Sequence, residues 1–292
     1  MRLGSVIDLV SRGLKPASAT QAAAARKEAP TDIVEQLARD IAAISPGKAA
    51  ELLTLVKRGL DSRTGEADRF VIAEALCAAV YPKYKFSEYG RLFLEDEEFL
   101  AYYRGIMDPG NWHSLDRKYT LDQMLKLVRH IDGEIAECGA YKGASALLMC
   151  RALLGTTSFV HLFDSFEGLA DPLPVDGGYW QKGSLTTSEA NLHETLRGMD
   201  NYRVYKGWIP ERFSEVADRT FRFVHIDVDL YEPTLASLAF FFPRLAPGGM
   251  VLLDDHGFAS CPGAKQAADE FFSDRPESIA MLPTGQAFAI KQ

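Results

Sequence analysis

The sequence is poor in cysteine, contains no long apolar run and carries no excess of basic charge. Its four cysteines form no CxxC pair and have no histidine at ligand spacing, which argues against a zinc site or a disulfide framework. The 32 basic and 40 acidic residues give a net charge of −8, which argues against nucleic acid or an anionic membrane as the main partner. No apolar run approaches the roughly 18 to 20 residues that span a bilayer, and the N-terminus lacks a secretory-type apolar core. We therefore expect a cytoplasmic protein.

The 292 residues suffice for one large or two small domains. Residues 1–30 lack sustained apolar periodicity, which predicts a mobile tail; their low acid content leaves an organellar presequence as a lesser alternative. Residues 31–110 read as helices, including Ala49 to Leu60 and Arg69 to Val80, and become rich in aromatics toward their end. We expect this region to form a subunit interface, hence a homo-oligomer, and part of a substrate cap. The predicted junction with a domain over 111–292 is Asp108-Pro109-Gly110.

Beyond the junction, an amphipathic helix from Tyr119 to Ile131, with Leu127 among its inward residues, precedes strands that alternate with helices. The predicted strands are 133–138, 159–164, 202–206, 221–227, 249–254, 278–282 and 286–291, and the intervening helices are 144–154, 188–199, 210–217, 233–245 and 262–273. The tight Pro283-Thr284-Gly285 turn forces the final strand to run antiparallel to its neighbour. We expect an α/β, Rossmann-like fold whose seven-stranded sheet ends in an antiparallel strand, preceded by the helical N-terminal region.

Four aspartates follow two buried strands late in the chain: Asp227 and Asp229 after the first, Asp254 and Asp255 after the second. A right-handed crossover places such strands side by side with their carboxyl ends at one edge, where open α/β sheets bind ligands. Clustered carboxylates repel one another unless a cation or a proton lies between them, and hard divalent cations prefer oxygen ligands. The alternative for Asp229 is a cap of the helix that opens near Pro233.

A loop with two glycines, Glu137-Cys138-Gly139-Ala140-Tyr141-Lys142-Gly143-Ala144-Ser145, follows the first strand. Gly139 permits a sharp turn, Gly143 permits close approach of helix and ligand, and the following helix offers free N–H groups. Only G-x-x-x-G is present instead of the dinucleotide-binding G-x-G-x-x-G, so the loop is less suited to bind a dinucleotide pyrophosphate. Asp164, at the end of the second strand, can accept hydrogen bonds from both hydroxyls of a ribose.

Five segments carry these features in order: E-C-G-A-Y-K-G-A-S at 137–145, F-D-S-F-E-G-L at 163–169, K-G-W at 206–208, H-I-D-V-D-L-Y-E-P-T at 225–234 and A-P-G-G-M-V-L-L-D-D-H-G at 246–257. Together they resemble the macrocin and mycinamicin O-methyltransferase family of class I S-adenosylmethionine-dependent methyltransferases, over about residues 115–292. The resemblance implies Mg²⁺-dependent methyl transfer from S-adenosylmethionine to a hydroxyl of a small-molecule acceptor, typically a deoxysugar of a natural product or a related glycoside. The implied cofactor residues are Glu137, Gly139, Tyr141, Gly143, Ser145, Asp164, Ser165, Gly207 and Trp208, and the implied metal ligands are Asp227, Asp254 and Asp255.

The protein's part in such a transfer is to align the reactants and to deprotonate the acceptor hydroxyl. Asp227 and His256 are the candidate bases by position, although His256 serves equally well as a packing or capping residue. The family often has Tyr where His256 stands, and the Lys of related catechol-type enzymes is replaced by Leu230. The long segment 167–187 predicts a lid or a substrate wall. Two other readings stay open: an NAD(P)-dependent oxidoreductase, and a non-catalytic methyltransferase-like binding protein.

Overall fold

The computed structural model describes residues 39 and 43 and the ranges 49–80, 92–107 and 114–292. The expected tail over 1–30 and the expected junction at 108–110 lie outside these residues. The chain divides into two compact units, 1–95 and 96–292, which are described separately. Among the described residues, no helix combines the length and the apolarity needed to cross a bilayer.

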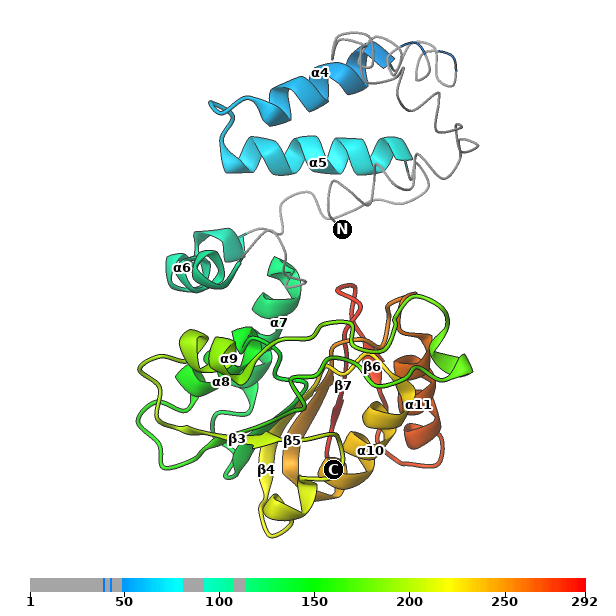
Figure 1. Cartoon of the computed structure of the whole chain (residues 1–292). Coiled ribbons are helices and arrows are strands. Elements are labelled where there is room, and N and C mark those ends of the chain that lie inside the picture. The colour runs from blue at the N-terminus through cyan, green and yellow to red at the C-terminus, as the bar shows by residue number, and fades with distance from the viewer. Residues whose placement is uncertain (1–38, 40–42, 44–48, 81–91, 108–113) are drawn as a thin grey trace. The chain divides into compact units, whose positions relative to one another are not determined.

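In the described part of the first unit, two α-helices pack against each other, α4 (Ala49–Leu60) and α5 (Glu66–Val80) (Figure 1). The predicted bounds of α4 are confirmed, and α5 begins three residues before the predicted Arg69. A short turn joins the two helices, and the exposed side chains of Arg58 and Asp68 form an ion pair across it with 3.3 Å between Nη2 and Oδ2.

The second unit is built on one seven-stranded sheet with the order β3-β2-β1-β4-β5-β7-β6. Strand β7 runs antiparallel to both of its neighbours, and the other strand pairs are parallel. The predicted fold class and the reversed last strand are therefore confirmed. The strands are β1 (Glu134–Cys138), β2 (Val160–Asp164), β3 (Tyr202–Lys206), β4 (Phe221–Ile226), β5 (Leu245–Leu253), β6 (Ala280–Met281) and β7 (Ala287–Ile290).

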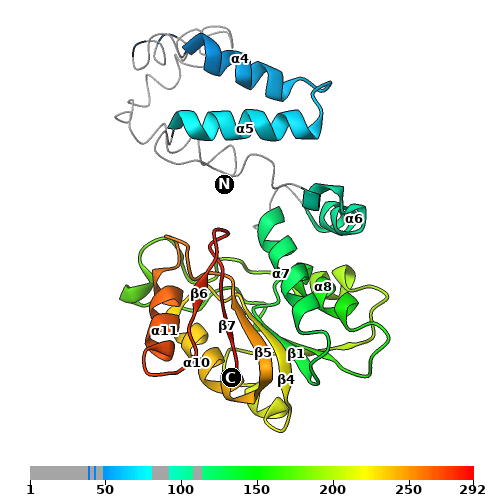
Figure 2. The same cartoon turned by 180° about the vertical axis from the view of Figure 1, so that it is seen from behind.

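Helices cover both faces of this sheet, with α7 and α8 on one face and α10 and α11 on the other (Figure 2). The helices of this unit are α6 (Glu97–Ile106), α7 (Leu115–Leu127), α8 (Ala144–Ala152), α9 (Glu189–Thr195), α10 (Tyr231–Phe241) and α11 (Pro262–Phe272). The predicted helix over 210–217 is wrong, because only a 3₁₀ turn forms there, Phe213–Val216. Its two buried side chains are three residues apart, the spacing that a 3₁₀ turn places on one side.

Strand β4 lies at the centre of the sheet and is buried along its whole length. Sheets covered on both faces have such continuous burial, and it fixes the strand firmly between its neighbours. In α7 the buried apolar stripe is Leu121 and Leu125, continued by the C-cap residue Val128, whereas Leu127, predicted to point inward, is 60% exposed. The stripe spacing of four and three residues leaves Leu127 on the outer side of the helix.

Candidate active site

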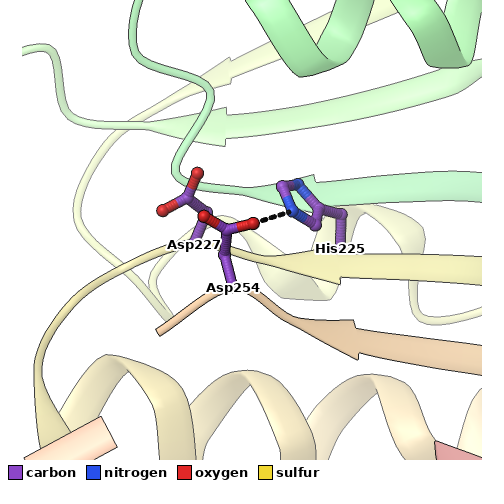
Figure 3. Close-up of side chains that lie close together, drawn as sticks. All are labelled: His225, Asp227 and Asp254. Carbon is purple, nitrogen blue, oxygen red and sulfur yellow. Dashed lines mark hydrogen bonds and ion pairs between the residues drawn. The ribbon is translucent and has the colours of Figure 1, made fainter. Parts of the chain in front are cut away.

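The carboxyl ends of β4 and β5 bring three titratable side chains together: His225, Asp227 and Asp254 (Figure 3). One ligand atom from each residue lies within 4.8 Å of the other two. The parallel register pairs Ile226 with Leu253, so the next residue of each strand meets its counterpart, and the N–H of Asp254 donates to the carbonyl of Ile226 at 2.8 Å. The predicted convergence of Asp227 and Asp254 is thus confirmed.

Asp254 is buried and held by donors from three directions. Its Oδ1 accepts hydrogen bonds from His225 Nε2 at 3.3 Å and from Gln286 Nε2 at 2.7 Å, and its Oδ2 forms an ion pair with Arg117 Nη1. Burial alone would raise the pKa of Asp254, but the Arg117 charge and the His225 hydrogen bond hold it well below the ordinary value. Asp254 is therefore a fixed and fully ionised carboxylate.

His225 links the cluster to the cofactor loop. Its Nδ1 lies 3.0 Å from Glu137 Oε1, while its Nε2 faces Asp254. Burial lowers the pKa of His225, but the two carboxylates outweigh burial and raise it to about 9. Both ring nitrogens therefore carry protons and donate, which leaves Asp227 and Asp254 as the ligand donors of the cluster.

Asp255 lies with Asp229 and Cys261 in a second group of possible ligands. Its Oδ2 accepts the backbone N–H groups of Val228 at 3.1 Å and Asp229 at 2.8 Å, so it fixes the turn after β4. Burial and the neighbouring acids raise its pKa well above the ordinary value. Its role as the third metal ligand stays a prediction.

The cap alternative for Asp229 is wrong, because the N-cap of α10 is Leu230 and has no side-chain cap. Instead, Asp176 Oδ1 accepts from the N–H of Tyr231 at 2.7 Å, and Asp176 Oδ2 accepts from the N–H of Leu173 at 2.8 Å. Asp176 is buried, and its side chain ties the long segment 167–187 to the start of α10.

His256 contacts a different partner from the acids of the first cluster. Its Nε2 lies 3.0 Å from Oδ1 of Asp269 on α11, and its Nδ1 is buried without a hydrogen-bond partner. These contacts give His256 a packing role on α11, and its role as a base stays a prediction.

The cofactor segments expected from the sequence meet around Asp164. Its carboxylate accepts from the N–H of Tyr141 at 2.7 Å and from the N–H of Phe166 at 2.6 Å, and its carbonyl accepts from the N–H of Gly207 at 3.0 Å. Burial raises the pKa of Asp164. Each carboxylate oxygen keeps a second lone pair, which suits the ribose hydroxyls. Trp208 follows Gly207 in the same turn, and the Ser165 hydroxyl, itself nearly buried, accepts from the N–H of Glu167 at 3.1 Å.

The cofactor loop also touches the acid cluster. Gly139 has φ +87°, and a Cβ built there would lie 1.8 Å from the carbonyl oxygen of Asp227. At the start of the loop, Glu137 is buried and its Oε2 has no hydrogen-bond partner. At the end of the loop, Ser145 Oγ accepts from Lys118 Nζ. A buried acceptor without a donor indicates a missing polar ligand, so these residues fit the expected cofactor.

Four polar residues of the site were not among the predicted site residues: Arg117, Lys118, His225 and Gln286. Arg117 and Lys118 lie on α7 and Gln286 lies just before β7, far along the chain from the residues that they contact. His225 lies on β4, within one of the motif segments. One signal was available, because Lys118 stands three residues before Leu121 on the buried stripe of α7. A lysine on an apolar stripe indicates a buried charge that contacts a specific polar partner.

The family model described as macrocin O-methyltransferase matches residues 115–279, more than half of the chain. The chain is 27% identical over 184 residues to demethyldecarbamoylnovobiocin O-methyltransferase of Streptomyces niveus, a match that covers 56% of this chain and 69% of the relative. It is 31% identical over 149 residues to an 8-demethyl-8-(2,3-dimethoxy-alpha-L-rhamnosyl)-tetracenomycin-C 4'-O-methyltransferase of Streptomyces olivaceus, covering 46% of this chain and 57% of the relative.

Among the solved structures that share the fold are the following two. The O-methyltransferase NovP superimposes with a TM-score of 0.54 at 23% identity, covering 66% of this chain and 88% of NovP. The calicheamicin methyltransferase CalS11 gives a TM-score of 0.55 at 19% identity, covering 84% of this chain and 93% of CalS11. The fold, the family match and the relatives together exclude the two alternatives, an NAD(P)-dependent oxidoreductase and a non-catalytic binding protein. The chain belongs to the macrocin O-methyltransferase family and is an S-adenosylmethionine-dependent O-methyltransferase.

Proposed function

We propose that this enzyme methylates a hydroxyl group on the sugar of a glycosylated natural product, and that the reaction requires Mg²⁺ held by Asp227 and Asp254. The pairing of these two carboxylates at the sheet edge carries the proposal. The acceptor class is supported by the names of the two relatives, which describe O-methylation of demethyldecarbamoylnovobiocin and of a rhamnosyl tetracenomycin.

The charges around the cluster favour a divalent cation. Five carboxylates interact electrostatically within this region, and three cationic side chains oppose them: Arg117, Lys118 and His225. When all five are ionised, two negative charges remain uncompensated. Burial and the charge of Asp254 raise the pKa of Asp227, as expected for a carboxylate that lacks a counterion. Oxygen donors alone suit Mg²⁺ better than zinc.

Mg²⁺ at Asp227 and Asp254 would lower the pKa of a hydroxyl that ligates it. Residues of the chain itself remove the acceptor proton and hold the site in place. Asp227 is the base that we assign to the acceptor proton, because its carboxylate lies at the sheet edge and no described residue donates a hydrogen bond to its side chain. Gly139 packs on the carbonyl of Asp227 and so places the cofactor loop beside that base. His225 and Gln286 hold Asp254 in one orientation.

Methyl transfer to a glycosylated acceptor, followed with and without a chelator, tests this proposal. Chelation should abolish transfer and leave the affinity for S-adenosylhomocysteine nearly unchanged, and Asp254→Asn should reproduce that separation. Asp227→Asn should lose transfer even with saturating Mg²⁺, whereas His256→Asn should retain most of it. If the metal-free enzyme transfers methyl at the normal rate, the metal assignment is wrong. If His256→Asn alone is inactive, His256 is the base.

We further propose that the helical region over 31–110 forms a homo-oligomer interface and caps the acceptor. The compact second unit begins earlier, at Asp96, because α6 packs within it: the buried Tyr102 donates its hydroxyl hydrogen to the carbonyl of Ala144 at 2.7 Å. A deletion should therefore end at residue 95 and spare α6. Sedimentation of the full chain as a monomer would reject the interface.

A further inference from the structure

Arg117 is a cation that is fixed at the edge of the acid cluster. Its side chain is only 14% exposed, and its Nη1 forms the ion pair with Oδ2 of Asp254. Two further contacts hold the guanidinium: its Nε donates to Ser114 Oγ at 3.1 Å, and its Cζ lies 5.0 Å from the centre of the Phe258 ring. These contacts distinguish Arg117 from an exposed surface ion pair, whose geometry is loose.

Asp254 does not need Arg117 to fix its orientation. His225 and Gln286 both donate to its Oδ1, which fills the two lone pairs of that oxygen. Among the described residues, only Arg117 donates to Oδ2, so that oxygen keeps one lone pair for a further partner. A metal ion on that lone pair and the guanidinium would share a single oxygen of Asp254. The guanidinium would therefore lie beside the other ligands of the ion.

Arg117 also acts on the assigned base. Its charge interacts most strongly with Asp254, and next with Asp227 and Asp255. A proton that moves from the acceptor to Asp227 therefore leaves a negative oxygen within the field of Arg117. A guanidinium is always charged in proteins and binds anionic oxygens through directed N–H groups. Fixed donors of this kind stabilise charge that develops in a transition state without having to reorganise.

We propose that Arg117 is a second cation of the active site, which binds the acceptor oxygen as the acceptor proton moves to Asp227 and which lowers the affinity of Asp227 and Asp254 for Mg²⁺. The inference rests on the proposed function and adds Arg117 to it. The electron pair stays on the acceptor oxygen and forms the new bond to the methyl carbon, whose bond to sulfur breaks. Loss of the Arg117 charge then has two opposite effects: Mg²⁺ binds more tightly, and an anionic oxygen binds less tightly.

Calorimetric titration of the full chain with MgCl₂, in the presence of S-adenosylhomocysteine, tests the first effect. Arg117→Met puts a neutral side chain of similar length in place of the cation. Five carboxylates then face two cations instead of three, so the uncompensated negative charge rises from two to three. Mg²⁺ should therefore bind Arg117→Met about 10-fold more tightly than the wild type.

Glycolate tests the second effect, because it presents one anionic and one neutral oxygen, as a diol does that has lost one proton. With Mg²⁺ at saturation, glycolate should bind Arg117→Met about 10-fold more weakly than the wild type, whereas ethylene glycol should bind both equally. Arg117→Lys keeps the charge but lacks the planar fork, so it should keep the wild-type Mg²⁺ affinity and recover part of the glycolate affinity. Lys126→Met removes a charge from the exposed side of the same helix and should change neither affinity.

Other results would overturn the proposal. Weaker Mg²⁺ binding by Arg117→Met would show that Arg117 orients Asp254, and unchanged affinities for Mg²⁺ and glycolate would show that it only packs α7 onto the sheet. Absence of glycolate binding by the Mg²⁺-loaded wild type would reject the contact with the acceptor oxygen. Failure of the wild type to bind Mg²⁺ would instead reject the proposed metal requirement itself. Thermal unfolding establishes that each variant is folded, and Arg117→Gln replaces the methionine variant if that one is not.

Discussion

Replacing Gly139 by alanine should both destabilise the protein and disrupt the site. Its φ of +87° lies in the left-handed region, which costs a non-glycine residue about 1 to 2 kcal/mol. A Cβ would also lie 1.8 Å from the carbonyl oxygen of Asp227, so the cofactor loop and the end of β4 must separate by about 1 Å. We expect a total loss of about 4 kcal/mol or more in the free energy of unfolding, the range of severe overpacking.

Gly155→Ala is the matched control, because Gly155 has a similar φ of +79° but no atom within 4 Å of the added Cβ. Its loss should equal the backbone strain alone, about 1 to 2 kcal/mol. Urea denaturation gives both free energies, and calorimetry with S-adenosylhomocysteine tests the site. Gly139→Ala should lower that affinity and Gly155→Ala should not. Equal destabilisation by the two substitutions would refute the contact between the loop and Asp227.

Three further substitutions test the framework. Arg222→Met removes a buried guanidinium that donates to the carbonyls of Gly133 and Arg129 and to the Ser158 hydroxyl. The free energy of unfolding should therefore fall by about 2 to 4 kcal/mol, and a change under about 1 kcal/mol would contradict this. Asp176→Ala should free the segment 167–187 from α10 and speed tryptic cleavage after the exposed Lys182; an unchanged cleavage rate would show another anchor. Burial lowers the pKa of His161 below 6.5, so its contribution to stability is complete above that pH and is lost as the pH falls below it. In His161→Gln, the free energy of unfolding should therefore fall less between pH 7.5 and pH 5 than in the wild type. An equal fall in both proteins would reject the assignment.

The elements that the sequence predicted are those governed by local pattern and strand adjacency. Asp227 and Asp254 meet because parallel register pairs the residues after two neighbouring strands. Asp255 follows Asp254 directly, and its Oδ2 accepts the backbone N–H groups of Val228 and Asp229 in the turn after β4, while its place among the metal ligands stays a prediction. Local pattern could not predict the contacts of Arg117 and Lys118. Their partners, Asp254 and Ser145, are 137 and 27 residues away, and only the packing of α7 brings them close.

The antiparallel course of β7 also decides where Gln292 lies. Because β7 begins beside the end of β5, Gln286 reaches Asp254, and the strand then runs away from the site until Lys291 pairs with Gly248 and Gly249. At roughly 3.3 Å per residue, Lys291 lies about 16 Å from the site edge. A linker attached at Gln292 would therefore hold the second unit on a sensor surface with the cofactor loop and the acid cluster facing the solution.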